Sequence, residues 1–181
     1  FNTALVDGDR LWAAGNDCVK DSGGTSSELC VYKFTDPGSL DNPVLDTAID
    51  VPGEGSAGDV AVFGTLVAVA SEDGLHFYDR QSLVFQSSYI PVSNYWYRAV
   101  AIVGDVAYLG DGYNKVFALD ISNPASPLPI GQPLTLPHSK RAFQWSQDTL
   151  SIGCENTLAK VPLNPNGSFG AAVVFHDGPG R

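Results

Sequence analysis

The sequence RAVAIVGDVAYLGDGYNKVFALDISNPASPLPIG, residues 98–131, decides the fold. Two apolar runs flank a turn at Gly104 and Asp105, and a third apolar run follows a polar loop and ends at Asp120. Runs rich in Val, Ile, Leu and aromatic residues, bounded by Gly, Asp, Asn and Pro, are typical of short β-strands. The segment therefore predicts consecutive antiparallel strands joined by tight turns.

The same pattern recurs in three other parts of the chain. The segments LVDGDRLWAAG (5–15), AVFGTLVAVAS (61–71) and QWSQDTLSIGC (144–154) each contain two apolar runs around a two-residue turn. A third run follows each pair, and a fourth strand is then expected at 44–51, 83–92, 127–136 and 170–177. Units with four strands, whose equivalent turns lie 56, 40 and 43 residues apart, are typical of β-propeller blades.

The predicted fold is all-β: a β-propeller of four four-stranded blades, at about 1–53, 54–94, 95–138 and 139–181. An ordinary β-sandwich is the alternative, and the shared register of the four units argues against it. The blades could form a closed four-blade ring or part of a larger propeller. A partial ring would have free edges, and free edges invite association with other chains.

The third unit carries a family resemblance. Val103 to Pro127 contain V-G-D-x-A-Y-x-x-D-G followed by x-V-x-A-L-D-I-S-N-P-x-x-P. These residues resemble the LVIVD-repeat family of bacterial and archaeal β-propellers. The second unit keeps the frame without the N-P-x-x-P ending, and the first and fourth are looser. The resemblance implies a propeller, often secreted or on the cell surface, in a family defined by its repeat rather than by an activity.

Composition excludes several classes of protein. With 10 basic and 20 acidic side chains among 181 residues, the net charge is −10, so neither nucleic acid nor an anionic lipid surface is an expected partner. No window approaches 18 consecutive apolar residues, so no membrane insertion is expected. The chain contains no Met and begins at Phe1. We therefore expect it to be a processed or excised piece of something longer.

The three cysteines bear on the compartment. Cys18 and Cys30 bracket a polar segment that would lie at one end of a hairpin, so the sequence predicts a disulfide between them. Cys154 follows an apolar run and is expected to be a buried free thiol. A disulfide, few lysines and the missing start favour an extracellular or cell-surface location.

Loops on the rigid scaffold are the expected place for a binding site. By analogy with other propellers, the links into inner strands and the loops between second and third strands form the ligand face. Aromatic residues and Arg are enriched at contact hot spots, and the two arginines of this set hold matching positions in their blades. The candidate partner-binding residues are Tyr95, Trp96, Tyr97, Arg98, Tyr113, His138 and Arg141.

Two readings of these residues stay open. Arg98 and Arg141 could hold an anionic ligand or a carboxylate at the mouth of the channel. They could instead pair with the protein's own acids, for which the candidates are Asp73, Asp111 and Glu155. The aromatic rings could likewise pack between blades.

Catalytic chemistry is hard to assemble from this sequence. The three histidines lack partners at metal-ligand spacing, and no known nucleophile or phosphate-binding motif occurs. We expect no metal and no cofactor. Structural calcium at Asp111-Gly112-Tyr113-Asn114 is an alternative, although Asp and Asn fill such turns for conformational reasons.

The leading hypothesis is a non-catalytic, secreted or cell-surface β-propeller module that binds a protein or assembles with copies of itself. The alternative is a fragment of a propeller hydrolase or lyase whose site lies at the channel mouth. That site would use Arg98, His138 and Arg141. Convergence of these three side chains on a pocket would favour the enzyme.

Overall fold

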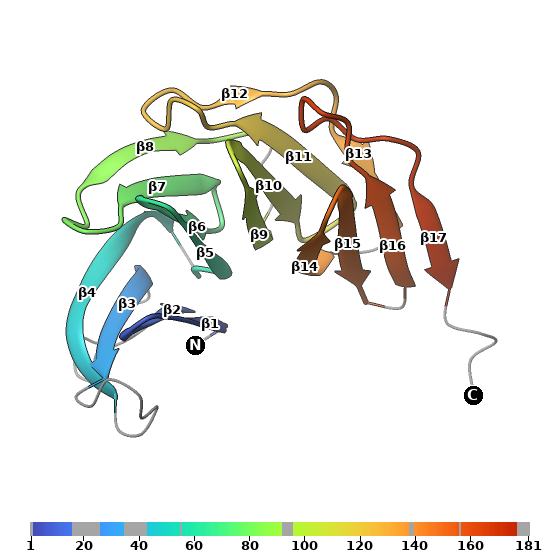
Figure 1. Ribbon diagram of the computed structural model, residues 1–181. Coiled ribbons are helices and arrows are strands. Elements are labelled where there is room, and N and C mark those ends of the chain that lie inside the picture. Colours follow the sequence, from blue (N-terminus) through green and yellow to red (C-terminus); the bar gives the residue numbers. More distant parts are fainter. Residues whose placement is uncertain are drawn as a thin grey trace, which may run out of the picture.

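The computed structural model describes residues 2–15, 26–34, 43–54, 56–91, 96–137, 140–155 and 157–176. In these residues all regular structure is β, arranged as four antiparallel sheets that follow one another along the chain (Figure 1). The predicted all-β propeller architecture with four blades is confirmed.

Each sheet is an up-and-down meander, because the pairing order follows the chain order. The strands of the first and second sheets are β1 (Thr3–Asp7), β2 (Arg10–Gly15), β3 (Ser26–Phe34), β4 (Pro43–Glu54), β5 (Asp59–Phe63), β6 (Leu66–Ala70), β7 (Leu75–Asp79) and β8 (Phe85–Tyr89). Those of the third and fourth are β9 (Tyr97–Val103), β10 (Val106–Asp111), β11 (Lys115–Asp120), β12 (Leu128–Pro129), β13 (Leu134–Thr135), β14 (Lys140–Ser146), β15 (Thr149–Cys154), β16 (Thr157–Pro162) and β17 (Val173–His176).

The outer strand of the third sheet differs from the prediction. A single strand was expected over 127–136, but two two-residue strands, β12 and β13, each pair separately with β11. Gly131 lies between them with φ +68°, a conformation that breaks a strand. Pro127 and Pro133 flank the pieces and lack the amide hydrogen that a ladder needs. This sheet therefore has five strands by pairing.

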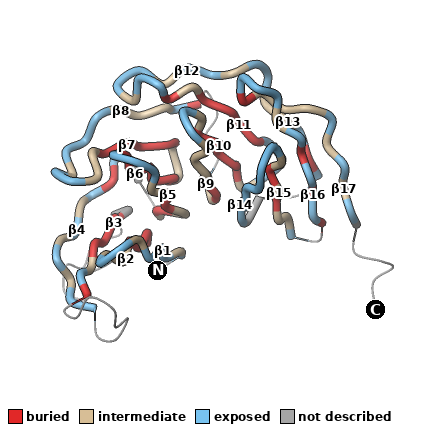
Figure 2. Tube along the Cα trace, viewed as in Figure 1, coloured by how far each residue is buried: buried red, intermediate tan, exposed pale blue. Residues whose placement is uncertain are grey.

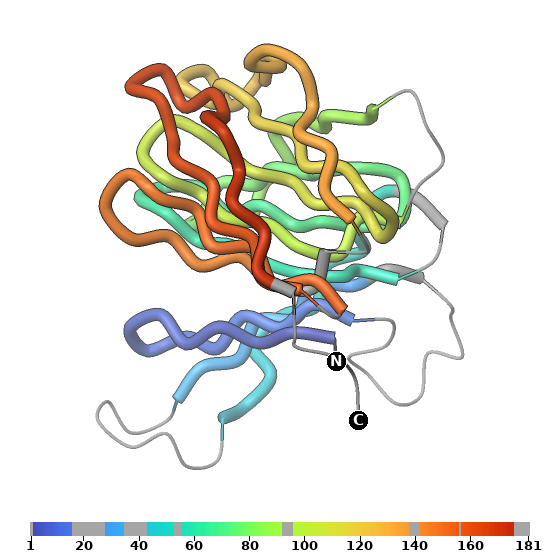
Figure 3. Tube along the Cα trace, turned by 90° about the vertical axis from the view of Figure 1, so that its right-hand side faces the viewer, coloured from blue at the N-terminus to red at the C-terminus, as the bar shows by residue number. Residues whose placement is uncertain are grey.

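The turns between first and second strands occur where the repeat places them. Gly64 and Gly104 have φ +57°, and the equivalent Gln147 in the fourth sheet has φ +54°. Glycine adopts this left-handed conformation without steric cost, whereas Gln147 pays about 1 kcal/mol for it. The hairpin turns lie together at one end of the molecule, and Figure 3 shows those of β1–β2 and β14–β15 on the same side.

The core is divided into three layers between successive sheets. Side chains of a strand alternate between its two faces, so a middle strand serves two neighbours. In β6, Val67 and Val69 pack toward the first sheet, while Ala68 and Ala70 pack toward the third. Tyr108 in β10 packs toward the fourth sheet. The second and third sheets are therefore buried on both faces (Figure 2).

The four sheets form an open arc. Contacts between inner strands run from β1 to β5, from β5 to β9 and from β9 to β14, and within the described residues none of similar extent joins the first sheet to the fourth. Figure 1 shows the same opening between β1 at one end and β17 at the other. Of the two arrangements that the sequence leaves open, this chain by itself has the unclosed one.

Candidate functional site

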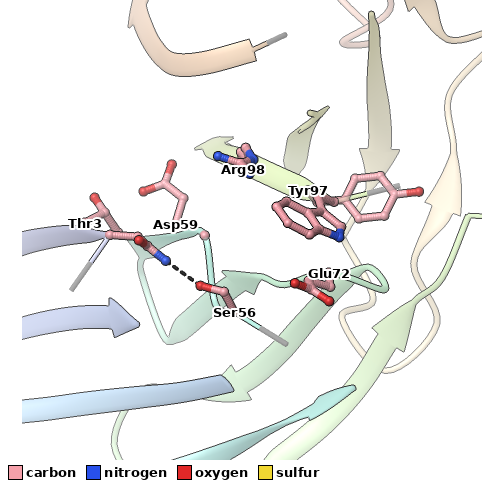
Figure 4. A pocket seen from close by; sticks show the side chains of 9 residues that line it. Thr3, Ser56, Asp59, Glu72, Tyr97 and Arg98 are labelled. Carbon is pink, nitrogen blue, oxygen red and sulfur yellow. Dashed lines mark hydrogen bonds between the residues drawn. The ribbon is translucent and has the colours of Figure 1, made fainter. Parts of the chain in front are cut away.

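A pocket of about 470 Å³ lies where the inner strands begin, at the end opposite their hairpin turns (Figure 4). Three sheets contribute to it because each inner strand starts at this end. Its lining residues are Asn2, Thr3, Ser56, Gly58, Asp59, Glu72, Trp96, Tyr97 and Arg98. This is the face on which the sequence places the candidate contact residues.

Asp59 ties the pocket wall together. Its Oδ1 accepts a hydrogen bond from the amide of Val60 and its Oδ2 one from the amide of Val100, each at 2.9 Å. The hydroxyl of Thr3 also donates to this carboxylate. Burial raises the pKa of Asp59 above its ordinary value, and these three hydrogen bonds oppose that rise. One side chain therefore connects β1, β5 and β9.

The residues that lead into β5 are also held by hydrogen bonds. Asn2 Nδ2 donates to Ser56 Oγ at 2.5 Å and to the carbonyl of Ala57 at 2.7 Å (Figure 4). A Cβ on Gly58 would lie 2.5 Å from the carbonyl oxygen of Tyr97, so only glycine allows β5 to approach β9 this closely. The backbone of β5 therefore lies directly against that of β9 beside the pocket.

Trp96 and Arg98 form the exposed wall. The guanidinium carbon of Arg98 lies 4.9 Å from the centroid of the Trp96 ring, a cation–π arrangement. Trp96 is 52% exposed, and the amide of Gly112 donates to its carbonyl at 2.5 Å, which fixes its backbone. Arg98 makes no ion pair with any side chain that the structure describes. Asp73 and Oδ1 of Asp111, both expected as internal partners, are hydrogen-bonded elsewhere, whereas Oδ2 of Asp111 has no hydrogen-bond partner among the described residues.

The other candidate residues fall into three groups. Tyr97 is buried, and its ring packs edge-on against Phe117, with centroids 6.1 Å apart, in the layer between the second and third sheets. Tyr113 is 58% exposed on the loop between β10 and β11 and is not among the residues that line the pocket. Tyr95, His138 and the side chain of Arg141 lie outside the described residues. Convergence of the two arginines therefore stays a prediction.

Sequence reasoning missed a buried polar network in the second sheet. His76 Nε2 lies 2.8 Å from Ser71 Oγ and 3.0 Å from Asp73 Oδ1, and His76 Nδ1 lies 2.7 Å from Ser88 Oγ. Burial lowers the pKa of His76, and Asp73 partly offsets this. The signal lay in the short spacing of Ser71, Asp73 and His76 and in the β7–β8 register that pairs His76 with Ser88.

This network has the residue types of a catalytic triad without its geometry. In a triad the acid and the nucleophile bond to different nitrogens of the imidazole ring. Here Ser71 and Asp73 both approach Nε2. Ser71 and His76 are fully buried, so no substrate reaches the hydroxyl. The arrangement stabilises the loop between β6 and β7.

The Asp111 loop also has a structural explanation. Asp111 Oδ1 accepts hydrogen bonds from the amides of Tyr113 at 3.0 Å and Lys115 at 2.7 Å, which is the ordinary way an Asp closes a turn. In the part of the chain that the structure describes, no group of three or more His, Cys, Asp and Glu side chains is placed to hold a metal ion.

The disulfide prediction falls partly outside the described residues. Cys30 is fully buried in β3, but its expected partner, Cys18, is not described, so their pairing stays a prediction. Cys154 is a free cysteine and is half-buried at the end of β15. In the described ranges, no helix is long and apolar enough to cross a membrane.

Residues 97–135 match the LVIVD repeat. The match confirms the family resemblance of the third unit and covers its sheet from β9 to β13. No curated protein matches the sequence of this chain.

Solved structures share the fold at low sequence identity. The computationally designed Ika4 protein aligns with a TM-score of 0.65 and 11% identity, over 98% of this chain and 91% of Ika4. The designed Ika8 protein aligns with a TM-score of 0.57 and 13% identity, over 89% of this chain and 45% of Ika8. A functionally unknown protein from Desulfotomaculum acetoxidans DSM 771 aligns with a TM-score of 0.53 and 12% identity, over 97% of this chain and 69% of that protein. These likenesses concern the fold alone.

Proposed function

We propose that this chain is a non-catalytic β-propeller module, extracellular or on the cell surface, that binds a protein partner through the pocket lined by Trp96 and Arg98. The observation that carries the proposal is the guanidinium of Arg98, held over an exposed Trp96 ring and in no ion pair among the described side chains. An exposed aromatic ring beside an Arg is the composition of an interaction hot spot.

The charges around the pocket indicate the chemistry of the partner. The guanidinium carbon of Arg98 lies 4.9 Å from the centre of the Trp96 ring, and its N–H groups would bind a carboxylate. Asp59 and Glu72 line the same pocket and would repel an anion placed on their side. The best ligand is therefore a peptide segment with an acidic side chain or a C-terminal carboxylate next to an apolar residue.

Close backbone packing supports the pocket. The backbone at Gly58 lies against Tyr97 of β9, and the amide of Gly112 donates to the carbonyl of Trp96. The hydrogen-bonded network of His76, Ser71 and Asp73 does not line the pocket, and His76 and Ser71 are fully buried. A predicted disulfide in an acidic chain with few lysines supports location outside the cytosol.

The proposal can be tested with a library of random peptides displayed on phage and selected on the immobilised protein. Sequences rich in Asp or Glu beside an apolar residue should be enriched. Arg98→Gln and Trp96→Ala should each weaken binding of the selected peptides by tenfold or more, about 1.4 kcal/mol. Trp145→Ala is the matched control, because Trp145 is similarly exposed at 49% but belongs to the fourth sheet.

Two outcomes would contradict the proposal. One is the absence of any common feature among the selected peptides. The other is unchanged binding when Arg98 and Trp96 are replaced, which would place the contact surface elsewhere on the molecule.

A further inference from the structure

We propose that two copies of this chain join head to tail into one closed ring, with the open face of the fourth sheet packed on the open face of the first sheet of the partner. The open face of the fourth sheet consists of Ser151, Gly153, Leu158, Lys160, Val173 and Phe175. The open face of the first sheet, which no other described sheet covers, centres on Ala4, Val6 and Leu11, and Ala13 beside them is fully buried. Neither face contributes to the Trp96–Arg98 pocket, so this inference goes beyond the proposed function.

Leu158 identifies the first of these faces as an interface. It pairs with Gly153, in the register that pairs Leu29 with Ala14, Leu75 with Ala70, and Val116 with Gly110. Those three equivalents are fully buried by the next sheet along the chain, with exposures of 0%. Leu158 is apolar at the same position and is 42% exposed.

The neighbouring strand repeats the comparison. Phe175 pairs with Leu158, as Ile49 pairs with Leu29, Tyr89 with Leu75, and Leu134 with Val116. All three equivalents of Phe175 pack into the layers between sheets. Phe175 itself is 48% exposed. Each of the first three sheets covers this apolar pair with the sheet that follows it in the chain. In the fourth sheet the equivalent pair, Leu158 and Phe175, remains exposed.

The open face of the first sheet has the complementary pattern. Val6 pairs with Leu11, in the register of Val62 with Val67 and of Ile102 with Ala107. Val67 and Ala107 are fully buried under the preceding sheet, and Val62 and Ile102 pack against the same layers. In the first sheet Val6 is 46% exposed and Leu11 is half-buried, whereas Leu150, the equivalent of Leu11 in the fourth sheet, is fully buried. The two open faces are therefore the two halves of the interface that recurs three times within the chain.

Charge also favours this pairing. Residues 1–53 contain nine acidic and three basic side chains, whereas residues 139–181 contain three acidic and four basic ones. Lys160 is exposed on the open face of the fourth sheet, and Asp50 is exposed on β4 of the first sheet. A head-to-tail contact places the acidic end of one copy against the basic end of the other.

A second copy completes a ring of reasonable size. A head-to-tail interface gives a closed ring only if the rotation between neighbouring copies is a whole fraction of 360°. Any other rotation gives an open filament. Four sheets from each copy make eight blades, within the usual range of four to eight for propellers. The arc also aligns with 45% of the longer Ika8 chain, so a longer propeller chain accommodates these sheets as one part. Figure 1 shows the open arc that the second copy would complete.

The test is the molar mass of the 181-residue chain in solution, measured by light scattering after size exclusion. We expect twice 19.1 kDa at concentrations on the order of 10 µM, where an interface of ordinary size is populated. Leu158→Glu should give the single-chain mass with an unchanged β-sheet circular dichroism spectrum. The matched control is Leu128→Glu, since Leu128 is 61% exposed on β12 and belongs to neither open face.

A second variant tests the charge argument. Lys160→Glu should raise the dissociation constant of the dimer about tenfold at low salt and less at high salt. Trp96→Ala should leave the mass unchanged, so failure of this inference and failure of the proposed binding function are distinguishable. Negative-stain images should show closed rings.

Three outcomes would overturn the inference. A wild-type chain with a single-chain mass would mean that something other than a second copy covers the open faces. Filaments would show that the rotation does not close with two copies. A dimer unaffected by Leu158→Glu would place the contact on another surface.

Discussion

The carboxylate of Asp59 in β5 accepts a hydrogen bond at 2.9 Å from the amide of Val100 in β9. Because Thr3 of β1 donates to the same carboxylate, one acidic side chain holds the starts of three inner strands. The pocket that we propose as a binding site opens on this junction. Its geometry therefore depends on contacts between sheets as well as on the lining residues.

Asp59→Ala should lower the free energy of unfolding by about 2 kcal/mol or more, because the amides of Val60 and Val100 lose their acceptor in a partly buried place. Urea denaturation followed by circular dichroism measures this change. Asp105→Ala is the control, since Asp105 is exposed in a hairpin turn, and its effect should stay within about 0.5 kcal/mol. Equal effects of the two variants would argue against the junction.

Gly58→Ala should destabilise the protein by about 1–3 kcal/mol, because the new methyl group would lie 2.5 Å from the carbonyl oxygen of Tyr97. Relief of that overlap requires β5 and β9 to separate. The matched control is Gly153→Ala, whose methyl group would meet Ala142 at ordinary contact distances of 3.7 and 3.9 Å. The melting temperatures of the two variants should therefore differ clearly, and similar values would contradict the close approach.

Stability should fall in mild acid because of His76. Burial lowers the pKa of His76 below 6.5 in the folded protein. Below pH 6.5 the unfolded chain therefore binds a proton at His76 more readily than the folded chain does. The full stability is present above pH 6.5 and is lost progressively as the pH falls from 6.5 toward the folded pKa. Urea midpoints between roughly pH 8 and pH 5 measure the effect, since these values bracket the ordinary titration of His.

The control for this acid sensitivity comes from the repeat itself. In the third sheet the position of His76 is held by Phe117, which pairs with Leu109 as His76 pairs with Val69. His76→Phe should reduce the change in the urea midpoint between roughly pH 8 and pH 5. If the variant keeps the wild-type slope, another group is responsible.

Thiol labelling of the denatured chain without reductant should detect one reactive cysteine, Cys154, if Cys18 and Cys30 are joined as the sequence predicts. Cys154→Ser should then show none. Reduction should cost about 3 kcal/mol of stability, the value for a loop of this length. Three reactive thiols in the wild-type chain would disprove the pairing and weaken the argument for an extracellular location.

The fold could be predicted because the repeat encodes it several times. The turns at Gly64 and Gly104 and the alternating apolar runs around them are local signals, and each blade is mostly local contacts. The split of the third sheet's outer strand at Gly131 was missed. Residues 127–133, PLPIGQP, contain β12 and the break at Gly131, and their apolar content by itself predicts one continuous strand.

The site could be predicted only as a region. Tyr97 is buried in the layer between the second and third sheets, whereas Trp96, one residue earlier, is exposed. The sequence of adjacent aromatic residues does not indicate which of them points into the core. The role of Asp59 was invisible because its partner, Val100, belongs to a different repeat. The polar network at His76 required the β7–β8 register, which sequence spacing alone does not give.

The middle strands that serve two layers have a consequence for the order of unfolding. Interior sheets lose contacts on both sides when they open, whereas the first and fourth sheets of a single chain lose contacts on one side. Protection against hydrogen exchange should therefore be greatest in β6 and β10 and decline toward both ends. Ring closure would remove this gradient, because every blade would then be an interior one.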